Sequence, residues 1–222
     1  MSKEIFYVGP SWATRSFDTV EGSEENYTNL LKEWNIDARN LAMVGLSNEN
    51  CLGLVKRSLD NCKGVIWVYC EPILQIEHEF KQALIENENF WDIREQINQQ
   101  TFKWINELNI PIGLIGGHSD IVNCTHPNIE IIHPSWQKFL ADNVDVNLIH
   151  GWGADVAHRY AMYEFPKSKL SNACIDYTSD TLNSWTKMEM RGVFRGVHPN
   201  RKGNELFARA IKNNIDIFIK NL

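Results

Sequence analysis

The sequence lacks the features of several protein classes. Its 222 residues contain no run of about 20 apolar residues, the length that a bilayer span requires, so we expect no membrane-spanning helix. A formal net charge of −6 leaves no broad basic field for a phosphate backbone, and we expect no nucleic-acid partner. The first residues carry no apolar stretch followed by a small-residue cleavage site. We therefore expect no signal peptide and a cytoplasmic location.

Disulfide and metal-binding patterns are also missing. The five cysteines form an odd number without a Cys-x-x-Cys pair, which favours reduced, buried thiols over a disulfide framework. The histidines are scattered, and their spacings match neither a His-Glu-x-x-His helix nor a compact zinc ligand set. We predict no metal site and no cofactor.

What the sequence does contain is an alternation of strand-length apolar runs with helix-period segments. The expected strands cover residues 5–8, 40–44, 64–70, 112–115, 129–132 and 146–149. The expected helices cover residues 24–34, 48–59, the polar region before Pro111, and 202–219. This alternation is typical of βαβ units on a mostly parallel sheet. With the chain length and 43% hydrophobic residues, it predicts one α/β domain over residues 1–222.

Helical periodicity also predicts which side chains face the core. In the helix at 48–59, the predicted inward face consists of Leu52, Val55 and Leu59. In the last helix, the predicted inward face is longer and consists of Leu206, Phe207, Ala210, Ile211, Ile215 and Phe218.

Two short segments point to chemistry. The first strand ends in a glycine and delivers Ser11 to the carboxyl edge of the sheet, where ligands bind in open α/β sheets. Near the other end of the chain, a loop sets His198 just ahead of the last helix. A serine needs a neighbouring base to become a nucleophile at neutral pH, and histidine has the pKa for that task. The fold has to bring these two residues together.

Around these two residues, the sequence resembles the SGNH (GDSL-type) hydrolases. The first motif of that family is a strand followed by Gly-Asp-Ser, and the last is Asp-x-x-His-Pro-x-x-x-Gly before the final helix. The corresponding segments here are Gly9-Pro10-Ser11 and His198-Pro199-Asn200-Arg201-Lys202-Gly203. The order of elements agrees along nearly the whole chain. The resemblance implies a flavodoxin-like, three-layer α/β/α sandwich and hydrolysis of an acyl or acetyl ester, in a small molecule or on a glycan, with Ser11 as nucleophile and His198 as base.

The resemblance also implies an oxyanion hole. The glycine of the family's second motif falls on Gly45, whose backbone N–H can approach a developing oxyanion without a Cβ in the way. The Ser11 backbone N–H is a further candidate. The family's third motif carries an asparagine, which is absent near Glu71, so Asn48 is the candidate side-chain donor.

Departures from the family pattern leave alternatives open. Pro10 replaces the aspartate before the serine, and Arg195 stands where the triad acid is expected, which leaves a Ser–His dyad or an altered triad. The Arg195 carbonyl, Glu71 and Asp176 are all open as the group that orients His198. One alternative is a catalytically inactive binding or structural protein on the same fold. Another is an enzyme in which Glu71 and Arg195 bind a charged small molecule.

Overall fold

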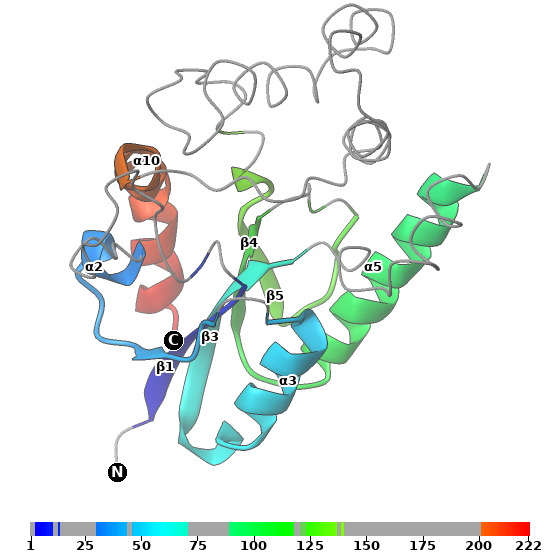
Figure 1. Ribbon diagram of the computed structural model, residues 1–222. Helices are drawn as coiled ribbons and strands as arrows, with labels where there is room; N and C mark the ends of the chain where they lie inside the picture. The colour runs from blue at the N-terminus through cyan, green and yellow to red at the C-terminus, as the bar shows by residue number, and fades with distance from the viewer. Residues whose placement is uncertain are drawn as a thin grey trace, which may run out of the picture.

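A computed structural model describes a parallel sheet and the helices that flank it (Figure 1). It describes residues 3–10, 13, 30–43, 46–70, 89–117, 121, 123–136, 139 and 201–222, without the side chains of residues 90, 91 and 201–204. The predicted strand at 146–149 and the first part of the predicted helix at 24–34 lie outside these residues.

The sheet has five strands in the order β2-β1-β3-β4-β5, and every neighbouring pair is parallel. The strands are β1 (Glu4–Val8), β2 (Arg39–Asn40), β3 (Cys62–Tyr69), β4 (Ile112–Gly116) and β5 (Ile129–His133). The prediction of an α/β fold with a parallel sheet is confirmed. Parallel strands that carry helices on both faces are buried on both sides, which is why β3 and β4 read as almost continuous apolar runs.

Helices pack on both faces of this sheet. Figure 1 shows α2 (Leu30–Trp34) and α10 (Arg201–Lys220) on one face, and α3 (Asn48–Lys56) and α5 (Phe90–Asn106) on the other. Side chains alternate along each strand, so each strand contributes to two separate cores. The α2/α10 core takes its strand residues from Ile5, Tyr7, Ile66, Val68, Ile115 and Ile132. The α3/α5 core takes its strand residues from Phe6, Val8, Val65, Trp67, Tyr69, Ile112, Leu114 and Ile129.

The helix α10 joins elements that lie far apart in the sequence. The indole Nε1 of Trp34 in α2 donates a hydrogen bond to the backbone carbonyl of Ala208, 174 residues later, at 3.0 Å. Phe207, Ile211 and Ile215 of α10 are fully buried or nearly so against the same face of the sheet. This final helix therefore closes the α2/α10 core.

Three sequence predictions need correction. The strand predicted at 40–44 is only Arg39–Asn40, although the N–H groups of Leu41 and Met43 still donate to the Tyr7 and Gly9 carbonyls. The helix predicted at 48–59 ends at Lys56. A separate short 3-10 helix, η2 (Leu59–Asn61), follows it.

The third correction concerns the buried face of α10. Leu206 and Ala210 are exposed, while Ala208 is buried instead. Their neighbours Phe207 and Ile211 occupy the predicted face. The buried stripe is thus narrower than predicted and turned toward α2, because Ala208 packs beside Trp34. Among the described helices, none combines the length and apolar character needed to cross a membrane.

Candidate functional site at the carboxyl edge of the sheet

The strand order reverses direction between β1 and β3. From β1 the chain goes to β2 on one side, and it then returns past β1 to form β3 on the other side. Such a reversal is the topological switch point of an open α/β sheet, and ligands bind outside the carboxyl ends of the strands there. Gly9 and Pro10 follow β1 at this point, and Cys70 follows β3.

Gly9 packs the turn after β1 tightly onto β3. Its φ is +154°, a backbone conformation that residues with a side chain rarely adopt. A Cβ at this position would lie 2.7 Å from the Cβ of Ala13 and 2.9 Å from the Val68 carbonyl oxygen. The Ala13 N–H in turn donates to the Pro10 carbonyl at 2.8 Å. Close packing against β3 therefore requires glycine directly before Pro10 and Ser11.

Asn48, the first residue of α3, ties that helix to the end of β3. Its side chain is 4% exposed. The amide Nδ2 donates to the Cys70 carbonyl at 2.6 Å, while Oδ1 accepts from the Cys70 N–H at 3.1 Å and from the Trp67 indole Nε1 at 3.3 Å. The preceding Ser47 caps the helix by accepting from the Asn50 N–H at 2.9 Å. The amide of Asn48 thus fixes both backbone polar groups of Cys70 at the end of β3.

Two thiols also lie at this edge. Cys51 is fully buried, and its pKa is raised to about 12, mainly by burial and further by the neighbouring Cys70. A backbone hydrogen bond with Gly9 opposes this rise only in part. Because the thiolate is the nucleophile, Cys51 stays neutral and unreactive near neutral pH. The prediction of reduced, buried thiols holds at Cys51, Cys62 and Cys70, whereas Cys124 is only partly buried and Cys174 lies outside the described residues.

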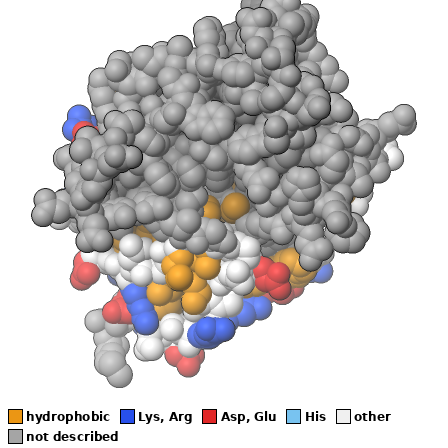
Figure 2. All heavy atoms as spheres, viewed as in Figure 1, with side chains coloured by type: hydrophobic (Ala, Val, Ile, Leu, Met, Phe, Trp, Pro, Cys, Tyr) orange, Lys and Arg blue, Asp and Glu red, His pale blue; other side chains and the backbone are white. Residues whose placement is uncertain are grey.

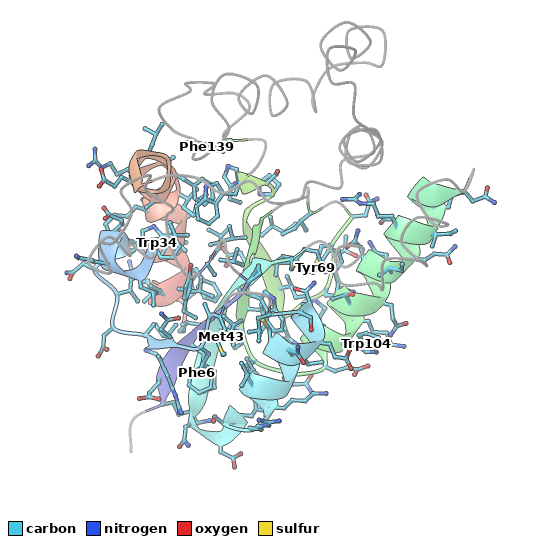
Figure 3. The ribbon with its side chains drawn as sticks, in the orientation of Figure 1. Phe6, Trp34, Met43, Tyr69, Trp104 and Phe139 are labelled. Carbon is cyan, nitrogen blue, oxygen red and sulfur yellow. The ribbon has the colours of Figure 1, made fainter. Side chains whose placement is uncertain are left out.

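The end of β4 approaches β3 as closely as β1 does. The Gly117 N–H donates to the Tyr69 carbonyl at 3.1 Å, and a Cβ on Gly117 would lie 2.7 Å from that same oxygen. The Tyr69 hydroxyl donates to the Asn98 side chain of α5 at 2.6 Å, so the ring is held against the helix (Figure 3). The absence of a side chain at Gly117 therefore lets the backbone after β4 approach the end of β3 closely.

At the far side of the edge, β5 ends in His133 within an aromatic cluster. The His133 ring lies 5.1 Å from the Phe207 ring and 6.2 Å from the Phe139 ring, and Trp136 stacks on Phe207 at 4.4 Å. The Nδ1 atom of His133 accepts from the Ser135 N–H at 3.2 Å, which places the proton of the neutral ring on Nε2. These contacts lock the end of β5 to the first half of α10.

The helix α10 runs antiparallel to the strands. Its early residue Phe207 lies beside His133 at the carboxyl end of β5. Its late residue Phe218 and the following Leu222 pack where a Cβ on Gly113 or Gly64 would stand, near the amino ends of β4 and β3. The described start of α10 therefore lies toward the same edge of the sheet as the end of β1.

Of the predicted site residues, Asn48 lies at this edge and is described in full. Ser11, Gly45, Glu71, Arg195 and His198 fall outside the described residues, as does Asp176. Groups of three or more His, Cys, Asp or Glu side chains suited to a metal ion are absent from the part of the chain that the structure describes.

Sequence reasoning missed three features of this edge. Asn48 bonds to Cys70 across 22 residues, and no local pattern signals such a contact. His133 is one of the scattered histidines, although it directly follows the strand predicted at 129–132 and ends β5. The close approach of Gly9 to Val68 was not predicted either, although a glycine directly after a buried strand suggests it. Comparison with protein-family models and with curated proteins finds no match.

Proposed function

We propose that the carboxyl edge of this sheet is the active site of a serine hydrolase that cleaves an acyl or acetyl ester. The observation that carries this proposal is the placement of two elements. The end of β1 reaches the switch point, and α10 begins toward the same edge. In the sequence, Ser11 comes two residues after Gly9, and His198 comes three residues before α10. The fold therefore supports a meeting of these two residues.

In the proposed reaction, His198 takes the proton of the Ser11 hydroxyl as the oxygen attacks the ester carbonyl carbon. The tetrahedral oxyanion accepts hydrogen bonds from the backbone N–H groups of Ser11 and Gly45. The protonated histidine then gives its proton to the leaving alcohol, which produces an acyl-serine. Water attacks the acyl-serine with His198 again as base, and this releases the acid and restores the hydroxyl.

Asn48 has a positioning role in this proposal. Its hydrogen bonds hold Cys70, which directly precedes Glu71 in the sequence, against α3. We assign Glu71 and Arg195 to substrate binding, because a carboxylate and a guanidinium recognise charged groups next to the ester. The substrate class is a small-molecule or glycan-linked ester.

A serine-directed fluorophosphonate probe and a short acyl ester test this proposal together. The native chain should be labelled at Ser11, and Ser11→Ala should abolish both labelling and hydrolysis. His198→Ala should lower kcat at least about 10²-fold, the range for loss of a general base. Ser58→Ala is the matched control, because Ser58 is partly exposed and its side chain caps no helix.

The outcomes separate the proposal from its alternatives. Unchanged hydrolysis in Ser11→Ala contradicts the mechanism. A native chain that is folded but neither labelled nor active favours a binding protein on the same fold. In that case, a rise in melting temperature with a small acid, phosphate or sugar would identify the ligand class.

A further inference from the structure

The outer face of α3 is unusual for a surface helix. Its inner face buries Cys51, Leu52 and Val55 in the α3/α5 core. At the middle of its outer face stands Gly53, where an added Cβ would meet nothing within 4 Å. A glycine inside a helix costs about 0.5–1 kcal/mol relative to alanine, and none of the described residues packs against this position. The position is thus open to close approach by another molecule.

Gly53 lies in an open groove whose lining mixes apolar with polar and charged side chains. The groove encloses about 520 Å³ and is lined by Met43, Leu46, Glu49, Asn50, Leu52, Gly53, Leu54, Lys56 and Arg57. Met43 is 57% exposed, the highest value among the large hydrophobic side chains described. Figure 2 shows hydrophobic side chains exposed on this face of the molecule with Lys and Arg side chains beside them, and Figure 3 labels Met43 on the same side. We call this groove the α3 surface.

Opposite charges stand at the two ends of the α3 surface. Glu49 lies in the first turn of the helix, and Lys56 and Arg57 lie at its end, seven and eight residues later. At about 1.5 Å per residue, the two charged ends are separated by about 10–12 Å along the helix. The ion pairs within the described residues involve none of these three side chains. The charges are therefore available to an external partner.

This arrangement is self-complementary. In an antiparallel pair of α3 helices related by a two-fold axis at Gly53, Glu49 of each copy lies beside Lys56 and Arg57 of the other. A two-fold interface uses the same patch on both subunits and therefore needs such self-complementary charge. Glycine at the crossing point lets the two backbones approach closely.

We propose that the α3 surface docks a second copy of this chain as an antiparallel, two-fold dimer. Nine residues line the groove, whereas a standard stable interface uses about 20–30 residues on each side. The dimer is therefore weak, with a dissociation constant on the order of tens to hundreds of micromolar. Salt weakens it, because the ion pairs at its ends are exposed.

Sedimentation of the full chain tests the self-association. At low salt, the weight-average mass should rise from monomer toward dimer between about 10 µM and about 500 µM protein, a range that spans such a Kd. A chain that stays monomeric over this whole range overturns the proposal, whatever the activity of the site.

A charge-swap mixture tests the geometry. Glu49→Arg gives one variant with positive charge at both ends of α3, and the double variant K56E/R57E gives another with negative charge at both ends. Each variant alone should dimerise at least about tenfold more weakly than the native chain, because like charges now face each other. An equimolar mixture should form a heterodimer with a Kd within about threefold of the native value, because one end keeps native Glu49 beside Lys56 and Arg57 while the other end has the same attraction with its signs reversed.

The mixture keeps the test independent of folding. Both variants place an unfavourable charge at a helix end, so far-UV circular dichroism should first show that each is folded. Glu130→Arg is the matched control, since it makes the same charge change at an exposed position on β5. Its self-association should equal that of the native chain. If the mixture associates no better than the separate variants, the antiparallel pairing of α3 is wrong.

Discussion

Asn48→Ala tests whether one buried amide holds the end of β3 against α3. The substitution removes the hydrogen bond from Nδ2 to the Cys70 carbonyl and the two bonds that Oδ1 accepts, from the Cys70 N–H and the Trp67 Nε1. A buried hydrogen bond contributes about 1 kcal/mol, and a polar group that loses its partner inside the protein costs more. We expect the free energy of unfolding to fall by about 3–4 kcal/mol. Urea denaturation followed by far-UV circular dichroism measures this loss.

Asn50→Ala is the matched control, because it replaces the same residue type in the same helix. Asn50 is exposed, and its backbone N–H keeps its bond to Ser47. We expect a change within about 0.5 kcal/mol. A loss below about 1 kcal/mol for Asn48→Ala, on the scale of one ordinary hydrogen bond, would refute the assigned role of Asn48.

Asn48→Asp sharpens the test through its pH dependence. The carboxyl group keeps an acceptor for the Cys70 N–H but faces the Cys70 carbonyl with an oxygen in place of the amide donor. Burial and that carbonyl raise the pKa of the introduced carboxyl group above its unfolded value. The variant should therefore be least stable at neutral pH and recover as the pH falls and the group becomes a donor again. Equal losses at neutral and acidic pH would contradict this geometry.

Gly9→Ala should lower the free energy of unfolding by about 2–4 kcal/mol, because its Cβ meets Ala13 and Val68 below contact distance at a positive φ. Gly53→Ala, measured at low protein concentration, should instead raise it by about 0.5–1 kcal/mol, because the helical position is open. Thermal unfolding of the two variants tests both predictions, and equal changes in the free energy of unfolding would contradict them. The Cys51 thiol is expected to make the free energy of unfolding fall at alkaline pH. Its pKa rises from 9.0 to about 12 on folding, so the thiol loses its proton at a lower pH in the unfolded state than in the folded state. The free energy of unfolding therefore falls above about pH 9, by about 2 kcal/mol between about pH 8.5 and 10.5. Cys51→Ala should flatten that decline in urea titrations; an unchanged slope would exclude this thiol as its source.

The sequence predicted a parallel sheet and its central strands, because burial on both faces makes β3 and β4 nearly free of charge. It failed at β2, whose two residues are exposed and carry no buried apolar pattern. It also misplaced the buried face of α10 at Leu206 and Ala210, since periodicity alone does not fix which way a helix turns toward its neighbour. That orientation depends on Trp34, a contact across 174 residues.

The candidate site likewise has features that the sequence predicts and features that it does not. Its predicted place at the carboxyl edge follows from the alternation of strands and helices along the sequence, whereas the strand order that creates the switch point is seen only in the structure. The contacts that shape it do not follow from local pattern. Asn48 is predicted as an oxyanion donor from its sequence position, and the structure adds its hydrogen bonds to Cys70 and Trp67. Such contacts depend on three-dimensional packing between segments that are not adjacent in the sequence.

The late position of α10 in the chain has a consequence for biosynthesis. The ribosome makes α2 first and reaches the partner of Trp34 only 174 residues later, which takes roughly 10–35 s at about 5–20 residues per second. During that interval, the sheet face formed by Tyr7, Ile66 and Val68 lacks its covering helix. The nascent chain therefore presents an apolar surface that chaperones can bind until α10 has been synthesised.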